Sequence, residues 1–225
     1  MKEVIFNGIF VFVICMLAAQ TARSQGTVYL SNLSQPSVGS AAVGSDSWLA
    51  EMISTGNNPG GYELDSVQLA MAPALGTPSG FTVMLYSRST RPSLGPTPGS
   101  SLGTLSGSST DPVTAGIYTY TASGLTLSSS SIYFIVLTAG TPVASGAYAW
   151  SVQNPSPITS SGGWNATVSV YTSVDGLAWS GPYSDDPQFA LTATAVPEPD
   201  TLYLLGLPGL LFVAWRRWRA KAQAR

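Results

Sequence analysis

The sequence predicts an all-β protein: a single antiparallel β-sandwich of jelly-roll type, with an N-terminal signal-peptide helix and a C-terminal transmembrane helix. Three observations support this prediction. Segments rich in Val, Ile, Thr, Tyr and Phe alternate apolar with small polar residues, which is typical of half-buried strands. Clusters of Gly, Pro, Ser, Asn and Asp separate these segments and favour turns. No central segment has a long apolar pattern at helical spacing.

The expected strands follow one another along the chain, and one low-complexity segment interrupts them. This segment, at 91–116, is predicted to form long loops around a short strand at 101–105, because neither flanking part has enough strands to close a sandwich alone. A linker between two domains is the alternative there, and an up-and-down barrel is the alternative for the whole region. The core is expected to include Leu69, Val83, Leu85, Ile135 and Leu137. The other strands are expected at 26–33, 62–71, 80–87, 116–122, 131–139, 147–153, 166–173 and 188–195.

Residues 1–24 have the layout of a secretory signal peptide. A lysine near the start precedes an apolar run at 9–19, and the small residues Ala22 and Ser24 follow two positions apart. We expect export by Sec-type machinery and cleavage by signal peptidase after Ser24. Cleavage removes Cys15, the one cysteine of the chain, so the mature protein forms no disulfide. A buried helix or a short anchor is the alternative.

Charge and side-chain chemistry limit the functions open to the central region. Only 9% of the residues are charged and the chain has no histidine, so Ser-His-Asp and Cys-His nucleophiles are excluded and zinc lacks its usual ligands. Only Arg88 and Arg91 are basic between 25 and 195, which argues against a nucleic-acid partner. We therefore expect no catalytic residue, no cofactor and no metal ligand. A glycosidase-type carboxylate pair and a calcium site are the alternatives, the latter from Asp175, Asp185 and Asp186.

Aromatic residues offer a different kind of site. Tryptophan rings on a sandwich face or rim can stack on sugars, and Trp48, Trp164 and Trp179 are the candidates for such stacking. Trp164 and Trp179 lie beside Gly-rich turns, where side chains are more often partly exposed. Trp150 alternates with Tyr148 in an expected strand and is more simply explained as core. Burial in the core is the alternative for all of these tryptophans.

The C-terminal residues combine three features in a fixed order. Val196, Pro197, Glu198 and Pro199 come first, and the prolines fix an extended backbone that a processing enzyme can accept. An apolar run at 202–215 follows, about 14 residues or about 21 Å as a helix, which is short for a membrane span but sufficient with local thinning. The positive-inside bias would then hold the basic end in the cytoplasm. The bases concerned are Arg216, Arg217 and Arg219.

This order resembles the PEP-CTERM sorting signal of bacteria that make exopolysaccharide. The resemblance implies that an exosortase, a membrane-embedded cysteine enzyme, recognises the tail and cleaves near the Pro-Glu-Pro motif. Glu198 and its neighbouring prolines would then be substrate features. A permanent membrane anchor without processing is the alternative.

The central region carries a second resemblance. The stretches SDSWLAEMISTGNNPGGYELDSVQLAM, FTVMLYS, PGSSLGTL and GIYTYTASGLTLSSSSIYFIVL, with Trp150 and Trp164, are similar to the choice-of-anchor R domain of exported bacterial proteins. The likeness covers about residues 26 to 195 and implies no catalytic residues.

The sequence therefore predicts a signal peptide at 1–24, an extracellular β-sandwich at 25–195 and a sorting signal at 196–225. The expected function is that of a non-enzymatic exported protein. It is held transiently in the membrane and then sorted to the cell surface or extracellular matrix, with a link to exopolysaccharide or biofilm. A polysaccharide is a further expected partner. A carbohydrate-binding module is the alternative function, and a glycoside-active enzyme is a more remote one.

Overall fold

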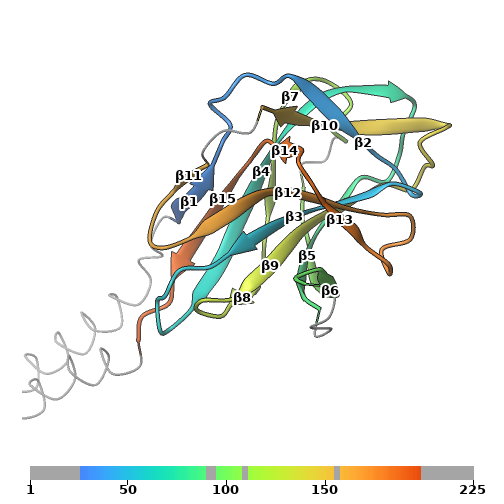
Figure 1. Ribbon diagram of the computed structural model, residues 1–225. Coiled ribbons are helices and arrows are strands. Elements are labelled where there is room, and N and C mark those ends of the chain that lie inside the picture. Colours follow the sequence, from blue (N-terminus) through green and yellow to red (C-terminus); the bar gives the residue numbers. More distant parts are fainter. Residues whose placement is uncertain (1–25, 90–94, 108–110, 155–157, 199–225) are drawn as a thin grey trace, which may run out of the picture.

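The computed structural model describes residues 26–89, 95–107, 111–154 and 158–198 (Figure 1). These residues form two antiparallel β-sheets and no helix, which confirms the all-β prediction for the described part of the chain. In that part no helix is long and apolar enough to cross a membrane. The expected signal peptide at 1–24 and transmembrane helix at 202–215 lie outside the described residues.

The larger sheet has nine strands and is organised around the long strand β4 (Tyr62–Gly76). One edge of β4 pairs with β15 along its first half and with β10 along its second half, while the opposite edge pairs with β8 and β7. Strand β1 pairs with β15, and β2 and β14 pair with β10. The other strands of this sheet are β1 (Thr27–Ser31), β2 (Gly39–Val43), β7 (Gly116–Thr121), β8 (Thr126–Leu127), β10 (Gly146–Gln153), β11 (Thr159–Ser160), β14 (Asp186–Pro187) and β15 (Phe189–Ala195).

The smaller sheet has six strands in the order β13-β12-β3-β9-β5-β6. Its centre is the pair β3 and β9, which runs in register from Leu49 opposite Leu137 to Ser54 opposite Ile132. The short strand expected at 101–105 is present as the second half of β6. The strands are β3 (Trp48–Ser54), β5 (Thr82–Arg88), β6 (Pro98–Leu105), β9 (Ile132–Thr138), β12 (Asn165–Ser173) and β13 (Ser180–Tyr183).

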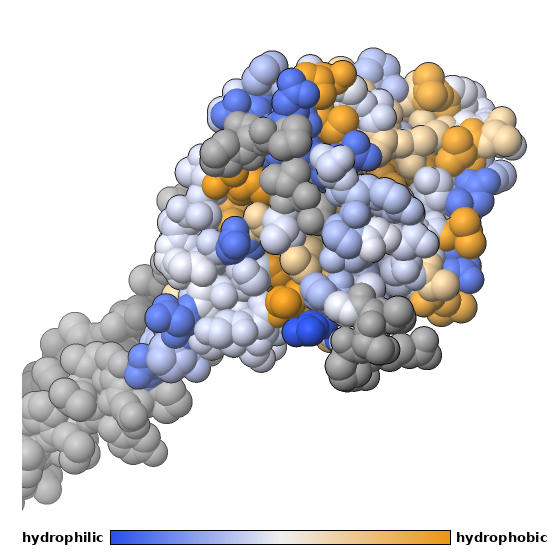
Figure 2. All heavy atoms as spheres, viewed as in Figure 1, coloured by the Kyte–Doolittle hydropathy of each residue, from blue (hydrophilic) through white to orange (hydrophobic). Residues whose placement is uncertain are grey.

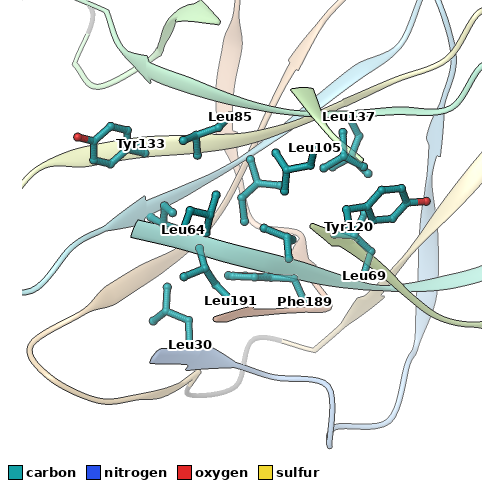
Figure 3. Packing of buried hydrophobic residues seen from close by; sticks show 14 of the residues in the cluster. Leu30, Leu64, Leu69, Leu85, Leu105, Tyr120, Tyr133, Leu137, Phe189 and Leu191 are labelled. Atoms are coloured by element: carbon teal, nitrogen blue, oxygen red, sulfur yellow. The ribbon is translucent and has the colours of Figure 1, made fainter. Parts of the chain in front are cut away.

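The two sheets share one hydrophobic core, to which both contribute buried side chains (Figure 3). Successive residues of a strand point to opposite faces, so on β9 Tyr133, Ile135 and Leu137 face this core. Leu69 of β4 and Phe189 of β15 reach the core from the other sheet. The arrangement is sandwich-like, with apolar side chains of two sheets packed against each other. The five core residues predicted from the sequence are all buried: Leu69, Val83, Leu85, Ile135 and Leu137.

The alternatives of a barrel and of two domains do not fit this arrangement. Within the described residues, only two isolated bridges, Gly44 with Ser47 and Ser106 with Thr121, connect the sheets, whereas an up-and-down barrel needs a continuous ladder. Strands from both sides of 91–116 pair with each other, as β4 does with β15 and β5 does with β9. The alternative interpretation of 91–116 as a linker between two closed domains is therefore wrong.

The surface is weakly polar over much of the face that Figure 2 shows, with separate hydrophobic patches between the polar residues. This agrees with a chain of which only 9% is charged. Both ends of the described sandwich lie at one end of the larger sheet. Strands β1 and β15 are antiparallel neighbours, and Thr27 pairs with Ala193.

Candidate functional site

The sandwich ends in a backbone segment that is fixed to a turn of the fold. Strand β15 stays paired to its last residue, with Ala195 opposite Tyr62. The Val196 N–H donates to the Gly61 carbonyl at 3.0 Å, and the Asn58 side-chain amide donates to the Val196 carbonyl at 2.9 Å. Because both backbone groups of Val196 are bonded, the chain is held in place up to the residue before Pro197.

The sequence of the turn explains why it can receive this segment. The Asn58 carbonyl accepts from the Gly61 N–H at 2.8 Å, which closes the turn, and Gly61 has a φ of 73°, a value that favours glycine. At Gly60 a Cβ atom would lie 2.3 Å from the Val196 carbonyl oxygen, so a larger residue would push the segment away. The two glycines are therefore what allow Val196 to approach the turn so closely.

The first residues of the predicted sorting motif leave the fold from this turn. Val196 is partly buried, whereas Pro197 and Glu198 are exposed. An enzyme can therefore reach the motif without opening the sandwich. Pro199 and the predicted basic stop at Arg216, Arg217 and Arg219 lie outside the described residues.

Next to the turn at 58–61, three aromatic rings form a packed cluster. Tyr29 stacks on Trp164 with ring centroids 4.8 Å apart, and Tyr62 meets Trp164 edge-on at 4.9 Å. The Tyr62 hydroxyl also accepts from the Asn58 backbone N–H at 3.2 Å. Trp164 is only 2% exposed, so it cannot stack on a surface ligand, and its assignment as a sugar-stacking residue is wrong. Its ring instead packs beneath the turn at 58–61. The contacts with Tyr29 and Tyr62 keep the ring buried, although a Gly-rich loop lies next to it in the sequence.

The outer face of the six-stranded sheet carries a second apolar layer, which we call the aromatic face. Side chains on β9 that alternate with the core residues contribute to it, as do outward residues of β3, β5 and β12. Phe134 and Tyr171 meet edge-on at 5.4 Å. The aromatic face consists of buried Ala50, Tyr86, Phe134, Val136 and Tyr171 and partly buried Trp48, Met52, Met84, Ile132 and Trp179.

Two of the three predicted stacking residues, Trp48 and Trp179, lie on the aromatic face, and both are partly exposed. The loop before β13 folds over Trp48, since a Cβ at Gly176 would lie 2.7 Å from the Trp48 ring. The Trp48 indole N–H donates to the Ser45 carbonyl at 3.0 Å. The structure thus brings these two rings to one face, although Trp48 and Trp179 are far apart in the sequence.

The three aspartates considered for calcium have different surroundings. Asp175 caps its own loop, and the N–H groups of Leu177 and Ala178 that bond its carboxylate lower its pKa. Asp185 is exposed, whereas Asp186 is fully buried. Among the described residues, no group of three or more His, Cys, Asp or Glu side chains could hold a metal. These three aspartates therefore do not form a shared site of that kind.

Comparison with known families identifies the C-terminal segment. Residues 195–219 match the family described as the PEP-CTERM protein-sorting motif, which begins at the last residue of β15. No curated protein gives a significant match to the chain. A signal of this kind marks an exported protein that an exosortase sorts to the cell surface after a transient stay in the membrane.

Sequence reasoning missed the residues that position this motif. Asn58, Gly60 and Gly61 were recognisable only as part of a turn, because their partner Val196 is more than a hundred positions away. The adjacency of two glycines after Asn-Pro was the available signal. Adjacent glycines indicate that another backbone segment can lie close to the turn, but they do not show which segment it is.

Proposed function

We propose that this protein is a non-enzymatic component of the cell surface or extracellular matrix, linked to exopolysaccharide or biofilm, which an exosortase processes near Pro197–Pro199. The observation that carries the proposal is the direct passage from β15 into the sorting motif, with the backbone of Val196 hydrogen-bonded to the fold. Cleavage near the motif would release the sandwich whole, with almost no flexible remnant. An exposed segment whose prolines favour an extended backbone suits the role of enzyme substrate.

The absence of a catalytic role is part of the proposal and is supported by the burial of the two acids that act on each other. A glycosidase needs two carboxyl groups that flank a substrate bond. Glu51 and Asp186, which lie close enough for the Asp186 charge to act on Glu51, are both 0% exposed. Substrate cannot reach these two groups in the folded sandwich.

The similarity of residues 26–195 to the choice-of-anchor R domain remains part of this proposal. In support, the two tryptophans of the resemblance, Trp150 and Trp164, are both buried and organise the packing at separate places in the sandwich. The GGY turn of the resemblance is the one that holds Val196. A domain that delivers its chain end to different anchoring tails would need a fixed exit of this kind.

The host's sorting enzyme provides the direct test. In a host that encodes an exosortase, we expect the protein in the matrix fraction without residues 200–225. After deletion of the exosortase gene, the full tail should stay in the membrane fraction, because no other step of export is affected. Immunoblots of both fractions and mass spectrometry of the C-terminal peptide measure this. Release from the deletion strain with an identical C-terminus would contradict the proposal.

A carbohydrate-binding role is the second candidate, and the aromatic face favours it. Trp48 and Trp179 are partly exposed there above a layer of buried rings, and rings fixed in this way bind sugars with little entropy loss. Such binding would also explain retention in a polysaccharide matrix.

If this second role is correct, Trp179→Ala should weaken binding of the purified protein to the host's own exopolysaccharide about fivefold or more, since one aromatic contact contributes about 1 kcal/mol or more. Affinity electrophoresis in gels that contain the polysaccharide measures the change. Leu177→Ala, an 85% exposed neighbour in the same loop, is the matched control and should bind as the wild type does. Equal migration of all three proteins with and without polysaccharide would rule out this role.

A further inference from the structure

A group of polar side chains lies buried where the two sheets approach each other. Glu51 of β3 and Asp186 of β14 are both 0% exposed, and Gln153 of β10 is 4% exposed. Strand β14 lies against β12 of the other sheet, and Val170 of β12 pairs directly with Glu51. The topology thus brings residues that are distant in sequence, from both sheets, into one interior cluster.

Hydrogen bonds fix one half of this cluster. The Asp186 carboxylate accepts from the Asn32 side-chain amide at 3.2 Å and from the Gln153 side-chain amide at 2.5 Å. Asn32 is itself held, because its amide oxygen accepts from the Phe189 N–H at 2.7 Å and its amide nitrogen donates to the Pro187 carbonyl at 2.9 Å. Asp186 and Gln153 are therefore held in defined positions before any ligand binds.

The other half of the cluster has oxygen atoms without partners. Both carboxyl oxygens of Glu51 and the side-chain oxygen of Gln153 are buried without a hydrogen bond. All three atoms are acceptors, so what they lack is a positive charge or a proton. The described residues supply no nearby cation, since Arg88 is the only base among them and is exposed at the end of β5. A buried carboxylate is costly unless it is paired with a cation or coordinates a metal.

We propose that Glu51, Asp186 and Gln153 bind one calcium ion between the two sheets. Two carboxylates and an amide oxygen are the ligand types that calcium prefers, and their two negative charges balance a divalent ion. Magnesium keeps several of its waters, which suits an enclosed site poorly, and zinc prefers His and Cys ligands. The ion would join the sheets in a domain that has no cysteine between residues 26 and 198.

This inference is independent of the proposed function, and it revises the expectation that the protein has no metal ligand. A proton is the competing occupant. Burial, and then the Asp186 charge, raise the pKa of Glu51 well above its ordinary value, so a neutral carboxylic acid would also remove the unpaired charge. The two occupants differ in one measurable respect, because only calcium binding makes the stability of the protein depend on a chelator.

The test uses the full chain purified in detergent. We expect elemental analysis by mass spectrometry to find about one calcium per chain after dialysis against calcium-free buffer without chelator. After treatment with EGTA, the melting temperature followed by circular dichroism should fall. Added calcium at about 100 times its dissociation constant should raise it by about 5 to 10 °C, and magnesium at the same concentration should raise it far less.

Glu51→Gln provides the matched variant, because it keeps the shape of the side chain and removes its charge. We expect this variant to fold without calcium and to lose the calcium-dependent rise in melting temperature. Glu63→Gln makes the same change at an exposed position of β4 and should respond to calcium as the wild type does. If Glu51→Gln does not fold, the calcium content of the wild type and its response to the chelator decide whether the proposal holds. Wild-type protein without calcium and insensitive to EGTA would overturn the proposal, as would a Glu51→Gln variant with the full calcium response.

Discussion

Replacing Pro197, Glu198 and Pro199 together with alanine should abolish release of the C-terminal tail while export continues. The apolar run and the arginines that follow the motif are unchanged, so membrane insertion should proceed as in the wild type. The alanine variant should therefore accumulate in the membrane, longer than the processed protein by residues 200–225. Immunoblots of membrane and matrix fractions, with mass spectrometry of the C-terminus, measure the effect in a host that has the sorting enzyme.

The structure makes this experiment specific to the motif. Pro197 and Glu198 are exposed and directly follow Val196, whose backbone is hydrogen-bonded to the turn at Asn58 and Gly61. The alanine variant should therefore melt within about 2 °C of the wild type, since surface substitutions usually change the free energy of unfolding by at most about 0.5 kcal/mol, or about 1 to 2 °C in a domain of this size. A loss of release then reflects failed recognition and not misfolding. If the wild type also keeps residues 200–225 in the membrane, the sorting interpretation fails and a permanent anchor replaces it.

Replacing Arg216, Arg217 and Arg219 is the informative comparison. Three positive charges that would hold the C-terminus in the cytoplasm disappear, while the Pro-Glu-Pro motif stays intact. This variant should therefore be retained less well in the membrane, whereas its Pro-Glu-Pro motif can still be recognised. The two variants therefore separate recognition of the motif from anchoring of the tail.

Trp150→Ala should have the largest effect on the stability of the sandwich. The indole is 0% exposed in the common core, and its N–H donates to the Gln188 carbonyl at 3.0 Å. Removing so large a buried ring should lower the free energy of unfolding by about 3 to 5 kcal/mol. A typical domain is stable by about 5 to 15 kcal/mol, so about a fifth or more of the stability would be lost. Chemical denaturation followed by far-ultraviolet circular dichroism measures the change.

A graded series distinguishes lost packing from the lost hydrogen bond. Trp150→Phe keeps an aromatic ring and removes the N–H donor, and the Gln188 carbonyl still accepts from the Ala70 N–H at 3.1 Å. This variant should lose clearly less stability than Trp150→Ala. Leu177→Ala, at a side chain that is 85% exposed, should change stability by at most about 0.5 kcal/mol. A Trp150→Ala protein as stable as the wild type would show that the ring is not part of a tightly packed core.

The strands were predictable wherever one face of a strand is buried and the other is not. On β7, for example, small polar residues alternate with tyrosines, and the period of two is visible in the sequence. Strand β3 was missed because it has no such alternation. Its outward residues Trp48 and Met52 join the aromatic face, and its inward position 51 is a glutamate between Leu49 and Ile53. Strand β2 was missed because its small residues have little strand preference.

Tryptophan exposure shows where local sequence stops being informative. Trp164 and Trp179 both lie beside glycine-rich turns, and no feature of the sequence distinguishes them. Packing separates them: Trp164 is enclosed by Tyr29 and Tyr62, while Trp179 stays partly exposed on the aromatic face. The partners that make this difference come from other strands, and their register is set by the whole fold.

The sequence by itself determined nine of the fifteen strands that the structure describes, five members of the core and the sorting motif. Each of these features depends on residues that are close together in the chain. Alternation of apolar and polar residues and the turn residues between them predict the strands and the core, and a short peptide with two prolines predicts the sorting motif. Only the tertiary structure decided that Asn58 holds Val196, 138 positions away, and that Glu51, Gln153 and Asp186 share one buried cluster. The physical reason is that a hydrogen bond or a buried charge depends on its partner, and the chain brings such partners together only when both sheets have formed.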